Sequence, residues 1–489
     1  MAGPGTNVIA PSSGENNLKN NFVNLLQRQR LAQLSDGTPS AEARIDRIDR
    51  AIALLVDHKN AIADALRGDF GHRSVHTSLL ADVAAPIVSL KYARSNLRCW
   101  MKPERRKVSP AFLSLFGARA YVTYQPKGVV GILSPWNYPL QLAFTPLAGV
   151  FAAGCRAMLK PSELSPRTSD LMAELFRKAF AETEVAVVLG GPDVGAAFAG
   201  LPFDHLLFTG ATSIGRHVAR AAAENLVPLT LELGGKSPVI VGRSANLKLA
   251  TKRLMLGKTL NAGQACLSPD FAILPQERVA DFVREAKSAI AAMYPSLREN
   301  PDYTSIINRR HYDRLQTYLQ DARAKGAEIV EINPAGEDFR EQPHPKIPPT
   351  LILNPKDDML VMQDEIFGPL LPVITYQSID EAIHAVNARP RPLGLYYFGS
   401  DKSEEELVLS RTISGGVTVN DVIQHVTMED LPFGGTGPSG MGAYHGVEGF
   451  RTFSHAKAVF RQSSLDVMAM MRPPWGTRFM KIVASLTKR

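Results

Sequence analysis

The residues best suited to chemistry in this chain are a cysteine and a glutamate 34 positions apart. Cys266 lies in LNAGQACLSPD and Glu232 lies in VPLTLELGGK. A cysteine attacks as a thiolate, and since a free thiol has a pKa of about 8.5, the fold must supply a base or a positive potential beside it. A lone cysteine is more often a small buried hydrophobic residue. We predict that Cys266 is a nucleophile, and Glu232 is the first candidate for its base.

The segment around Glu232 indicates how the carboxylate is positioned. Residues 227–236 form a short apolar stretch that reaches Glu232 and then breaks at Gly234 and Gly235, which is the pattern of a strand followed by a loop. Such corners are where α/β enzymes place catalytic groups. We therefore expect Glu232 at the end of a strand.

Strands and helices alternate along most of the chain, and this alternation predicts an α/β fold with parallel, doubly wound sheets. The first run predicts a Rossmann-type dinucleotide-binding domain, and the second predicts another α/β domain that carries Cys266. The first run has predicted strands at 128–133, 157–160, 185–189 and 204–209, with helices at 141–153, 166–181 and 212–225. The second has predicted strands at 238–241, 271–274, 371–376 and 417–420, with helices at 247–260 and 378–387.

Composition limits the class of protein. The chain has 489 residues, of which 45% are hydrophobic and 21% charged, as in folded globular proteins. Its three cysteines have no CxxC spacing, so we predict neither a disulfide framework nor a metal site, and a cytoplasmic location. We also predict no signal peptide and no transmembrane segment, because no long apolar run occurs.

The net charge of +8 raises the possibility of a nucleic-acid or anionic membrane partner. Basic residues cluster in PERRK at 103–107 and in the C-terminal tail, whereas elsewhere they alternate with acidic residues. Such alternation is typical of solvated helix faces. We predict no nucleic-acid partner.

Two turns have the chemistry to bind a dinucleotide. Lys160 and Glu163 follow a predicted strand in KPSE, where an ammonium and a carboxylate could hold a ribose diol. Gly210, Thr212 and Gly215 form GxTxxG between a strand and a helix, where free N–H groups could face an anion. Neither motif is an ordinary Rossmann fingerprint, and a surface ion pair with a plain helix start is the alternative.

Taken together, these motifs resemble the aldehyde dehydrogenase superfamily from about residue 22 to the C-terminus. Glu232 with LGGK and Cys266 with NAGQA carry the resemblance, and QDEIFGP at 363–369 and LPFGGTGPSG at 431–440 extend it. CLSPD, KPSELSPRTS and the RPPWGTRFMK tail look like the class 3 branch, particularly the coniferyl-aldehyde dehydrogenase-like group. Ala265 departs from the threonine usual in that group, which concerns local packing.

The resemblance implies roles for further residues. Asn137 and the Cys266 N–H would stabilise an oxyanion, and Lys160 and Glu163 would hold the adenosine ribose. The GxTxxG turn would lie beneath the pyrophosphate. The remaining implied cofactor contacts are Trp136, Glu365 and Phe367, with NAD as the cofactor and NADP possible.

The implied reaction is oxidation of an aldehyde to a carboxylic acid. Cys266 would add to the aldehyde, hydride transfer would give a thioester, and Glu232 would activate the water that hydrolyses it. Two alternatives remain, namely an acylating or other-substrate reductase of the same superfamily, which generally lacks this glutamate, and a non-catalytic binding or structural protein.

The resemblance also implies a homodimer and a division of the chain. An alternating strand at 118–125 has no place in the nucleotide-binding sheet, and we expect it, with the tail, at a subunit interface. The expected parts are a flexible start at 1–20, an NAD(P)-binding domain at 21–104 and 128–233, a catalytic domain at 234–420, and an oligomerisation hairpin and tail at 105–127 and 421–489.

The stretches near Asn137 and Asn420 indicate an apolar substrate tunnel. They contain no lysine or arginine that could pair with a substrate carboxylate, and burying an unpaired charge is costly. We expect medium-chain aliphatic or aromatic aldehydes of the cinnamyl or coniferyl type as substrates, although ordinary core packing is the alternative. The expected wall residues are Tyr138, Leu142, Phe144, Val422 and Ile423.

Overall fold

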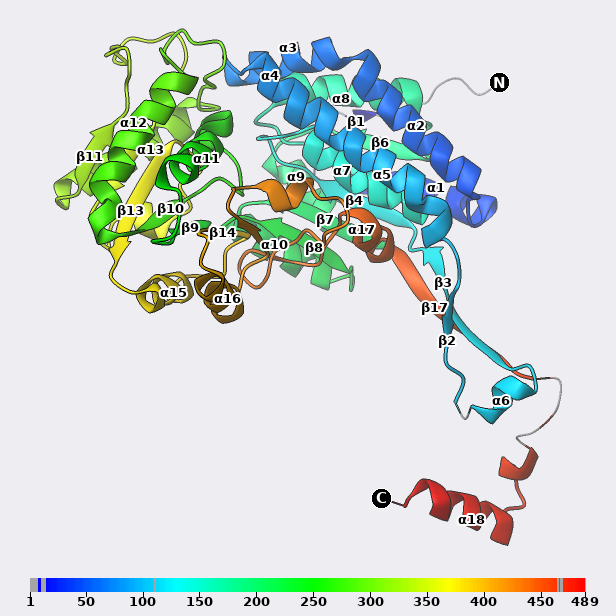
Figure 1. Cartoon of the computed structure of the whole chain (residues 1–489). Helices are drawn as coiled ribbons and strands as arrows, with labels where there is room; N and C mark the ends of the chain where they lie inside the picture. The colour runs from blue at the N-terminus through cyan, green and yellow to red at the C-terminus, as the bar shows by residue number, and fades with distance from the viewer. Residues whose placement is uncertain (1–7, 10–14, 110, 464–465, 467–468, 489) are drawn as a thin grey trace.

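The computed structural model describes residues 8–9, 15–109, 111–463, 466 and 469–488. They form two seven-stranded sheets and one three-stranded sheet. Figure 1 shows two α/β bodies side by side and a narrow arm that leaves one of them. None of the helices in these ranges is long and apolar enough to cross a membrane.

The first sheet has the order β1-β6-β5-β4-β7-β8-β16, and all its neighbouring pairs are parallel except β8 with β16. Its central strands are short, apolar and buried, as expected for a sheet with helices on both faces. The strands are β1 (Val8–Ile9), β4 (Val129–Leu133), β5 (Arg156–Lys160), β6 (Val185–Val188), β7 (His205–Gly210), β8 (Leu229–Leu233) and β16 (Gly440–Met441).

Successive residues of a strand face opposite sides of a sheet, and the two cores of this body follow that rule. Val130 and Ile132 of β4 belong to one core, and Val129 and Leu133 belong to the other. The first core includes residues of α2 (Ala41–Asp57), α3 (Lys59–Phe70), α5 (Ala85–Trp100), α7 (Gln141–Ala153) and α8 (Pro166–Ala179). The second includes residues of α1 (Glu15–Asp36), α9 (Pro192–Ala199) and α10 (Thr212–Ala223).

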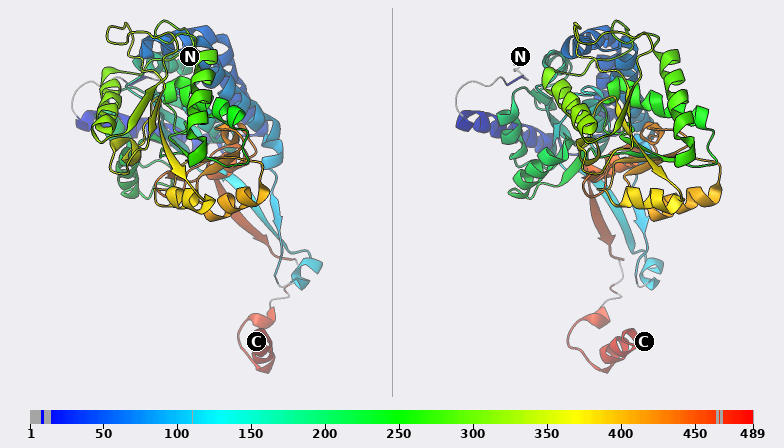
Figure 2. Two further views of the ribbon diagram at one scale, coloured as in Figure 1. Left: turned by 60° about the vertical axis from the view of Figure 1, so that its left-hand side comes forward. Right: turned by 90° about the vertical axis from the view of Figure 1, so that its left-hand side faces the viewer.

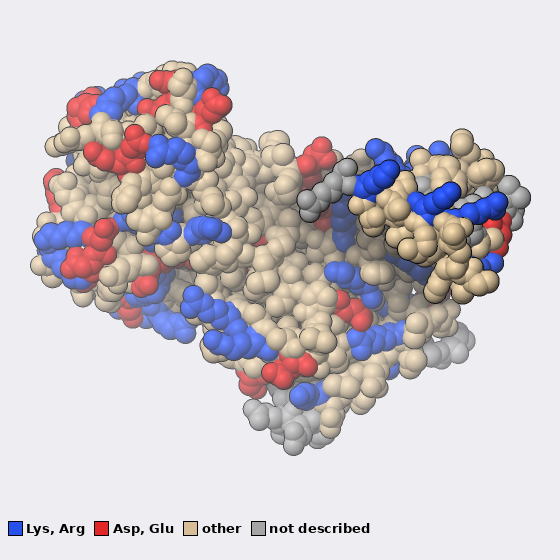
Figure 3. All heavy atoms as spheres, turned by 90° about the horizontal axis from the view of Figure 1, so that it is seen from below, with Lys and Arg blue, Asp and Glu red and all other residues tan. Residues whose placement is uncertain are grey.

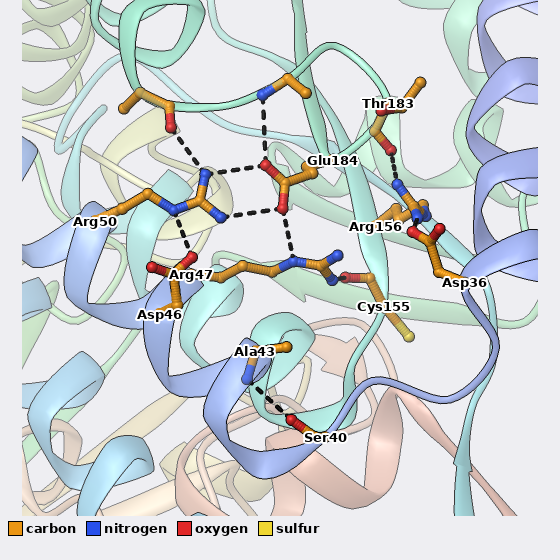
Figure 4. A network of polar contacts seen from close by, with 12 residues as sticks. Asp36, Ser40, Ala43, Asp46, Arg47, Arg50, Cys155, Arg156, Thr183 and Glu184 are labelled. Carbon is orange, nitrogen blue, oxygen red and sulfur yellow. Dashed lines mark hydrogen bonds and ion pairs between the residues drawn. The ribbon is translucent and has the colours of Figure 1, made fainter.

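Polar contacts fasten α2 to the edge of β5 and β6. Glu184 accepts from Arg47 Nε at 3.0 Å and from Arg50 Nη1 at 2.9 Å. Arg156 pairs with Asp36 at the end of α1, and Figure 4 shows both groups close together. These contacts fasten α1 and α2 at the amino-terminal ends of β5 and β6, away from the carboxyl ends of the strands.

The second sheet has the order β11-β12-β13-β10-β9-β14-β15 and is parallel except between β11 and β12. Its faces are covered by α11 (Leu247–Thr259) with α12 (Val279–Met293), and by α13 (Arg309–Ala324), α15 (Ile379–Asn387) and α16 (Lys402–Arg411). The strands are β9 (Pro238–Val241), β10 (Phe271–Pro275), β11 (Glu328–Glu331), β12 (Thr350–Leu353), β13 (Leu370–Tyr376), β14 (Gly394–Phe398) and β15 (Gly416–Val419).

The arm is an antiparallel sheet of β2 (Glu104–Arg106), β3 (Arg119–Pro126) and β17 (Ser454–Arg461). It projects from the first body with α6 (Phe112–Leu115) and α18 (Thr477–Leu486) at its far end, and the other views agree (Figure 2). The tail carries several basic side chains in the view from below, where acidic and basic groups mix over the body (Figure 3).

The structure contains each strand and helix predicted in the two alternating runs, with ends shifted by a few residues at most. The first body adds α9, the short strand β1 within the expected flexible start, and α1 from residue 15, and the second body adds α12, α13, α16, β11, β12 and β14. The structure also differs from the predicted division after residue 420. Phe433, Tyr444, Phe450 and Phe453 are buried in the first core, because this segment folds back over α7 before β17 enters the arm.

Candidate active site

Cys266 lies in a sharply folded loop after α11. Asn261, Ala262 and Gly263 have φ of 52°, 53° and 74°, a left-handed run that is costly for residues with a Cβ. Buried Gln264 fixes the turn by donating to Asn261 O and Ser305 O at 2.9 Å each. A strained loop, fixed by the hydrogen bonds of Gln264, thus presents the half-buried Cys266 thiol.

Glu232 lies at the end of β8, as predicted. β16 pairs beside it, with Gly440 opposite Glu232, and a Cβ at Gly440 would lie 2.1 Å from the Leu231 carbonyl oxygen. The Glu232 side chain is buried, and neither carboxylate oxygen has a hydrogen-bond partner. Burial therefore raises the pKa of Glu232 well above its ordinary value.

A second carboxyl group, Glu365, reaches the same corner from the loop before β13. A Cβ at Gly234 would lie 2.1 Å from Glu365 Oε2, so only glycine permits this approach. Glu365 Oε1 is buried without a partner. Burial, with the charge of Asp270 as the next cause, raises the pKa of Glu365 to about 8.

Lys236 fastens the Glu365 loop to the Cys266 side. Its Nζ pairs with Asp270 and donates to Val361 O at 2.6 Å and Asp364 O at 2.9 Å. Asp270 Oδ1 in turn accepts from Ile366 N at 2.9 Å. The lysine of ELGGK is thus committed to holding the loop.

The sequence left two ways to activate the thiol, a neighbouring base or a positive potential, and the charged groups beside Cys266 are carboxylates. Burial, then the charges of Glu365 and Glu232, raise the pKa of Cys266 to about 12. The backbone N–H groups of Cys266 and Leu267 lower this pKa, but by less than burial and the two carboxylates raise it. Since the thiolate is the nucleophile, the proton must pass to a base, and carboxylates with raised pKa values can accept it near neutral pH.

Asn137 is brought to the Cys266 loop, as the oxyanion role requires. It is buried, and its Nδ2 donates to Gln264 O at 3.2 Å. This contact leaves the second amide hydrogen for a ligand. Trp136, from the same loop, packs edge-on against Phe367 at 5.4 Å between ring centroids, so these two predicted cofactor contacts lie together.

The two predicted nucleotide turns follow β5 and β7, the strands that flank β4 in the first sheet. Lys160 Nζ pairs with Glu163 Oε2 at 3.0 Å. α10 begins after Ala211, which cannot cap it, so its N-terminal N–H groups are available to an anion. Gly215 allows close packing of α10 on β8, since a Cβ there would lie 2.6 Å from Leu233 Cδ2.

These features fit NAD(P). An uncapped helix N-terminus suits a pyrophosphate, the Lys160 and Glu163 pair suits a ribose diol, and the unpartnered Glu365 Oε1 can accept from a second ribose. Within the described residues, no group of three or more His, Cys, Asp or Glu side chains could hold a metal ion.

The expected tunnel residues separate into two groups. Tyr138 is buried with no partner for its hydroxyl group, and Leu142 and Ile423 are half-buried. Phe144 instead packs in the first core, 5.0 Å from Phe176 between ring centroids, and Val422 belongs to the core of the second body. Phe144 and Val422 therefore cannot line a substrate tunnel, because core residues enclose their side chains.

Tyr444 was missed by the sequence reasoning. It is buried, and the charges of Glu232 and Cys266 act on it, which places it beside both. Residues 421–453, which fold back over α7, bring Tyr444 to this position. No local pattern in the sequence predicts that contact.

Comparison with known proteins agrees with this geometry. The aldehyde dehydrogenase family model matches residues 28–459. A probable coniferyl aldehyde dehydrogenase of Caulobacter vibrioides is 61% identical over 95% of this chain and 96% of that protein. The chain belongs to the aldehyde dehydrogenase family. Its activity is therefore NAD(P)-dependent oxidation of an aldehyde to a carboxylic acid.

Other relatives share the whole length. Coniferyl aldehyde dehydrogenase of a Pseudomonas species is 56% identical over 92% of this chain and 93% of its own. Among solved structures, the substrate-bound state of Staphylococcus aureus AldH has a TM-score of 0.89 at 35% identity, covering 95% of this chain and 99% of that one. An aldehyde dehydrogenase of Mycobacterium tuberculosis complexed with NAD⁺ has a TM-score of 0.82 at 27% identity, covering 94% and 92%.

Proposed function

We propose that this aldehyde dehydrogenase acts on apolar aromatic aldehydes of the coniferyl type, with Cys266 as nucleophile, Glu232 as base and Asn137 as oxyanion donor. One observation carries the assignment of roles. The Cys266 thiol, the unpartnered Glu232 carboxyl group and the Asn137 amide converge on one buried site from different elements. The names of the two coniferyl aldehyde dehydrogenases support the substrate class.

The first step is addition of the Cys266 sulfur to the aldehyde carbon, with its proton passing to a carboxylate. Glu232 and Glu365 can both take this proton, because each has a buried carboxylate oxygen without another partner, and Glu232 must be deprotonated again before it acts on water. As the carbonyl oxygen becomes negative, the Asn137 amide and the Cys266 N–H stabilise it. A donor already in place is worth about 2.7 to 4 kcal/mol to such a transition state.

When bound, NAD(P) supplies the hydride acceptor that converts the thiohemiacetal into a Cys266 thioester. Lys160 and Glu163 would hold the adenosine ribose, with the start of α10, including Gly210, Thr212 and Gly215, at the pyrophosphate. The predicted contacts at the nicotinamide end are Trp136, Glu365 and Phe367.

Hydrolysis of the thioester needs a base for water. A buried carboxyl group with a raised pKa is matched to this task. We assign it to Glu232, and its presence argues against the acylating alternative, in which coenzyme A would take the acyl group. Product formation independent of coenzyme A is the expected result, and strict dependence would support the alternative.

Substrate choice is tested by kcat/KM for coniferaldehyde, benzaldehyde, hexanal and succinate semialdehyde. Tyr138, Leu142 and Ile423 provide apolar surface, and each buried methylene is worth about 0.8 kcal/mol. We expect the first three aldehydes to exceed the semialdehyde, whose charged tail would need a partner. A clear preference for the semialdehyde would contradict the proposal.

We further propose a homodimer and a cytoplasmic location. The arm exposes Phe112 and Leu115 on α6 and Phe460 on the edge strand β17, and apolar surface beside an edge strand is usually covered in solution. All three cysteines are free, which fits a reducing compartment. Light scattering at micromolar concentration should give twice the chain mass, and a monomeric mass would refute the dimer.

A further inference from the structure

A buried arginine lies directly behind the proposed oxyanion asparagine. Arg73, in the loop between α3 and α4 (Val75–Ser78), has a fully buried side chain. Its Nη1 donates to Asn137 O at 2.7 Å, whereas Asn261 Nδ2 reaches the same oxygen at 3.3 Å. Arg73 is therefore the stronger anchor of the Asn137 peptide group, and no step of the proposed mechanism uses it.

The partner of Arg73 is equally buried and fastens the other end of the Asn137 loop. Asp82 Oδ2 accepts from Arg73 Nη2 at 2.6 Å. Asp82 Oδ1 accepts from Leu140 N at 3.1 Å and from Gln141 N at 3.3 Å. It thereby caps α7, which has no N-cap side chain of its own. One carboxylate thus holds both the arginine and the helix that begins after Asn137.

The surroundings leave Arg73 little freedom. Its guanidinium carbon lies 4.7 Å from the Phe70 ring centroid and 5.1 Å from that of Tyr138. Its Nε is buried without a partner. A buried ion pair is weak grounds for stability, because desolvation offsets the attraction. The geometry it imposes is a better explanation for its place.

The same loop is also bonded to the side of the site that carries the cysteine. His72 O accepts from Ser305 N at 2.9 Å, and Ser74 Oγ donates to Asp302 Oδ1 at 3.0 Å. Ser305 O accepts from Gln264, which holds the Cys266 turn. The flanks of Arg73 therefore connect the Asn137 loop with the Cys266 loop.

We propose that Arg73, held by Asp82, is a positioning residue that sets the Asn137 peptide group and so directs the Asn137 amide at the developing oxyanion. This inference rests on the proposed role of Asn137. Without the guanidinium group, the Asn137 carbonyl keeps only the longer contact with Asn261, and the amide loses its fixed direction.

A double-mutant cycle tests this coupling. Arg73→Met, Asn137→Ala and the double variant are compared by kcat/KM for benzaldehyde with NAD. Arg73→Met should lower kcat/KM about tenfold to hundredfold, within the loss caused by removing an oxyanion donor. In the Asn137→Ala background it should have almost no further effect. Effects that simply multiply would overturn the proposal, because Arg73 would then act independently of Asn137.

Matched variants separate positioning from folding. Arg47→Met also removes a buried guanidinium group, paired with Glu184 at 3.0 Å, and should leave kcat/KM unchanged. If Arg73→Met does not fold, Arg73→Lys serves in its place, since lysine keeps the charge but not the two-pronged geometry. If Arg73→Lys keeps the wild-type kcat/KM while Arg47→Met lowers it, the proposal is overturned. Failure of the wild type on every aldehyde would instead refute the proposed function.

Discussion

The two ends of the site treat polar groups in opposite ways. At the Cys266 end, the Glu232 carboxyl group and one oxygen of Glu365 are buried without partners. At the proposed ribose end, Lys160 and Glu163 are already paired at 3.0 Å, and the Glu163 side chain is 39% exposed. The polar groups at the Cys266 end are buried without hydrogen-bond partners, whereas Lys160 and Glu163 bond to each other and Glu163 also reaches solvent.

This difference follows from what each end must do. A desolvated carboxyl group has a raised pKa and can take up a proton near neutral pH, which chemistry at a thiol requires. A paired lysine and glutamate recognise a ligand by exchanging hydrogen bonds, and this needs no shifted pKa. The catalytic end therefore carries a cost in stability that the ribose end avoids.

The largest expected effect comes from removing the base at the catalytic end. Glu232→Gln should slow steady-state turnover about 10²- to 10⁴-fold, because a positioned general base typically contributes that much. A burst of NADH equal to the enzyme concentration should remain, because Glu365, the other carboxyl group at the thiol, can still take the Cys266 proton while the thioester forms. Cys266→Ala should remove the burst as well. Undiminished turnover by Glu232→Gln would contradict the assignment.

The comparison also predicts a stability difference that depends on pH. The folded-state pKa of Glu232 is raised above its unfolded value. The folded wild-type protein is therefore most stable at low pH, where Glu232 is protonated, and its free energy of unfolding falls as pH rises through the folded-state pKa. Glu232→Gln removes this loss. Its free energy of unfolding should exceed that of the wild type by about 1 to 3 kcal/mol at pH 8, and the gap should shrink towards pH 5. Denaturant titrations at both pH values measure it, and a constant gap would contradict it.

How much of this contrast the sequence could predict depends on the kind of signal. Apolar strands and glycine breaks placed Glu232 at the end of β8, because period and turn chemistry are local. The charge around Cys266 was not predictable, since Glu365 comes from a distant loop. Arg73 and Asp82 were missed because a loop and the π-helix η1 (Leu79–Ala84) have no recognisable period.

The substrate wall shows the same limit. α7 is apolar on nearly every side, so the sequence alone could not decide that Phe144 faces the core and Leu142 does not. Likewise, glycine-rich residues 431–440 resembled a loop near the site, but only the fold shows β16 opposite β8.

A smaller effect concerns the thiol itself. The pKa of Cys266, raised to about 12, implies slow alkylation by iodoacetamide near pH 8 and a rate that climbs with pH. Glu365→Gln removes the neighbouring charge that raises the Cys266 pKa more, and it should lower the apparent pKa by about one unit, which corresponds to roughly 1.4 kcal/mol. Glu232→Gln should lower it less. Exposed Glu174→Gln on α8 is the control, and equal curves for all four proteins would show that burial alone sets the pKa.

The smallest expected effect tests the ribose end. The Glu163 carboxylate can accept from a ribose 2′-OH but repels a 2′-phosphate, so NAD should be preferred over NADP. Because Glu163 is partly exposed and paired with Lys160, solvent and the ammonium group weaken the repulsion to about 1 kcal/mol. Glu163→Gln should therefore shift the NAD to NADP ratio of kcat/KM only about fivefold towards NADP. Burst size and thiol alkylation should not change, because the catalytic end is untouched. An unchanged ratio would mean that another group selects the cofactor.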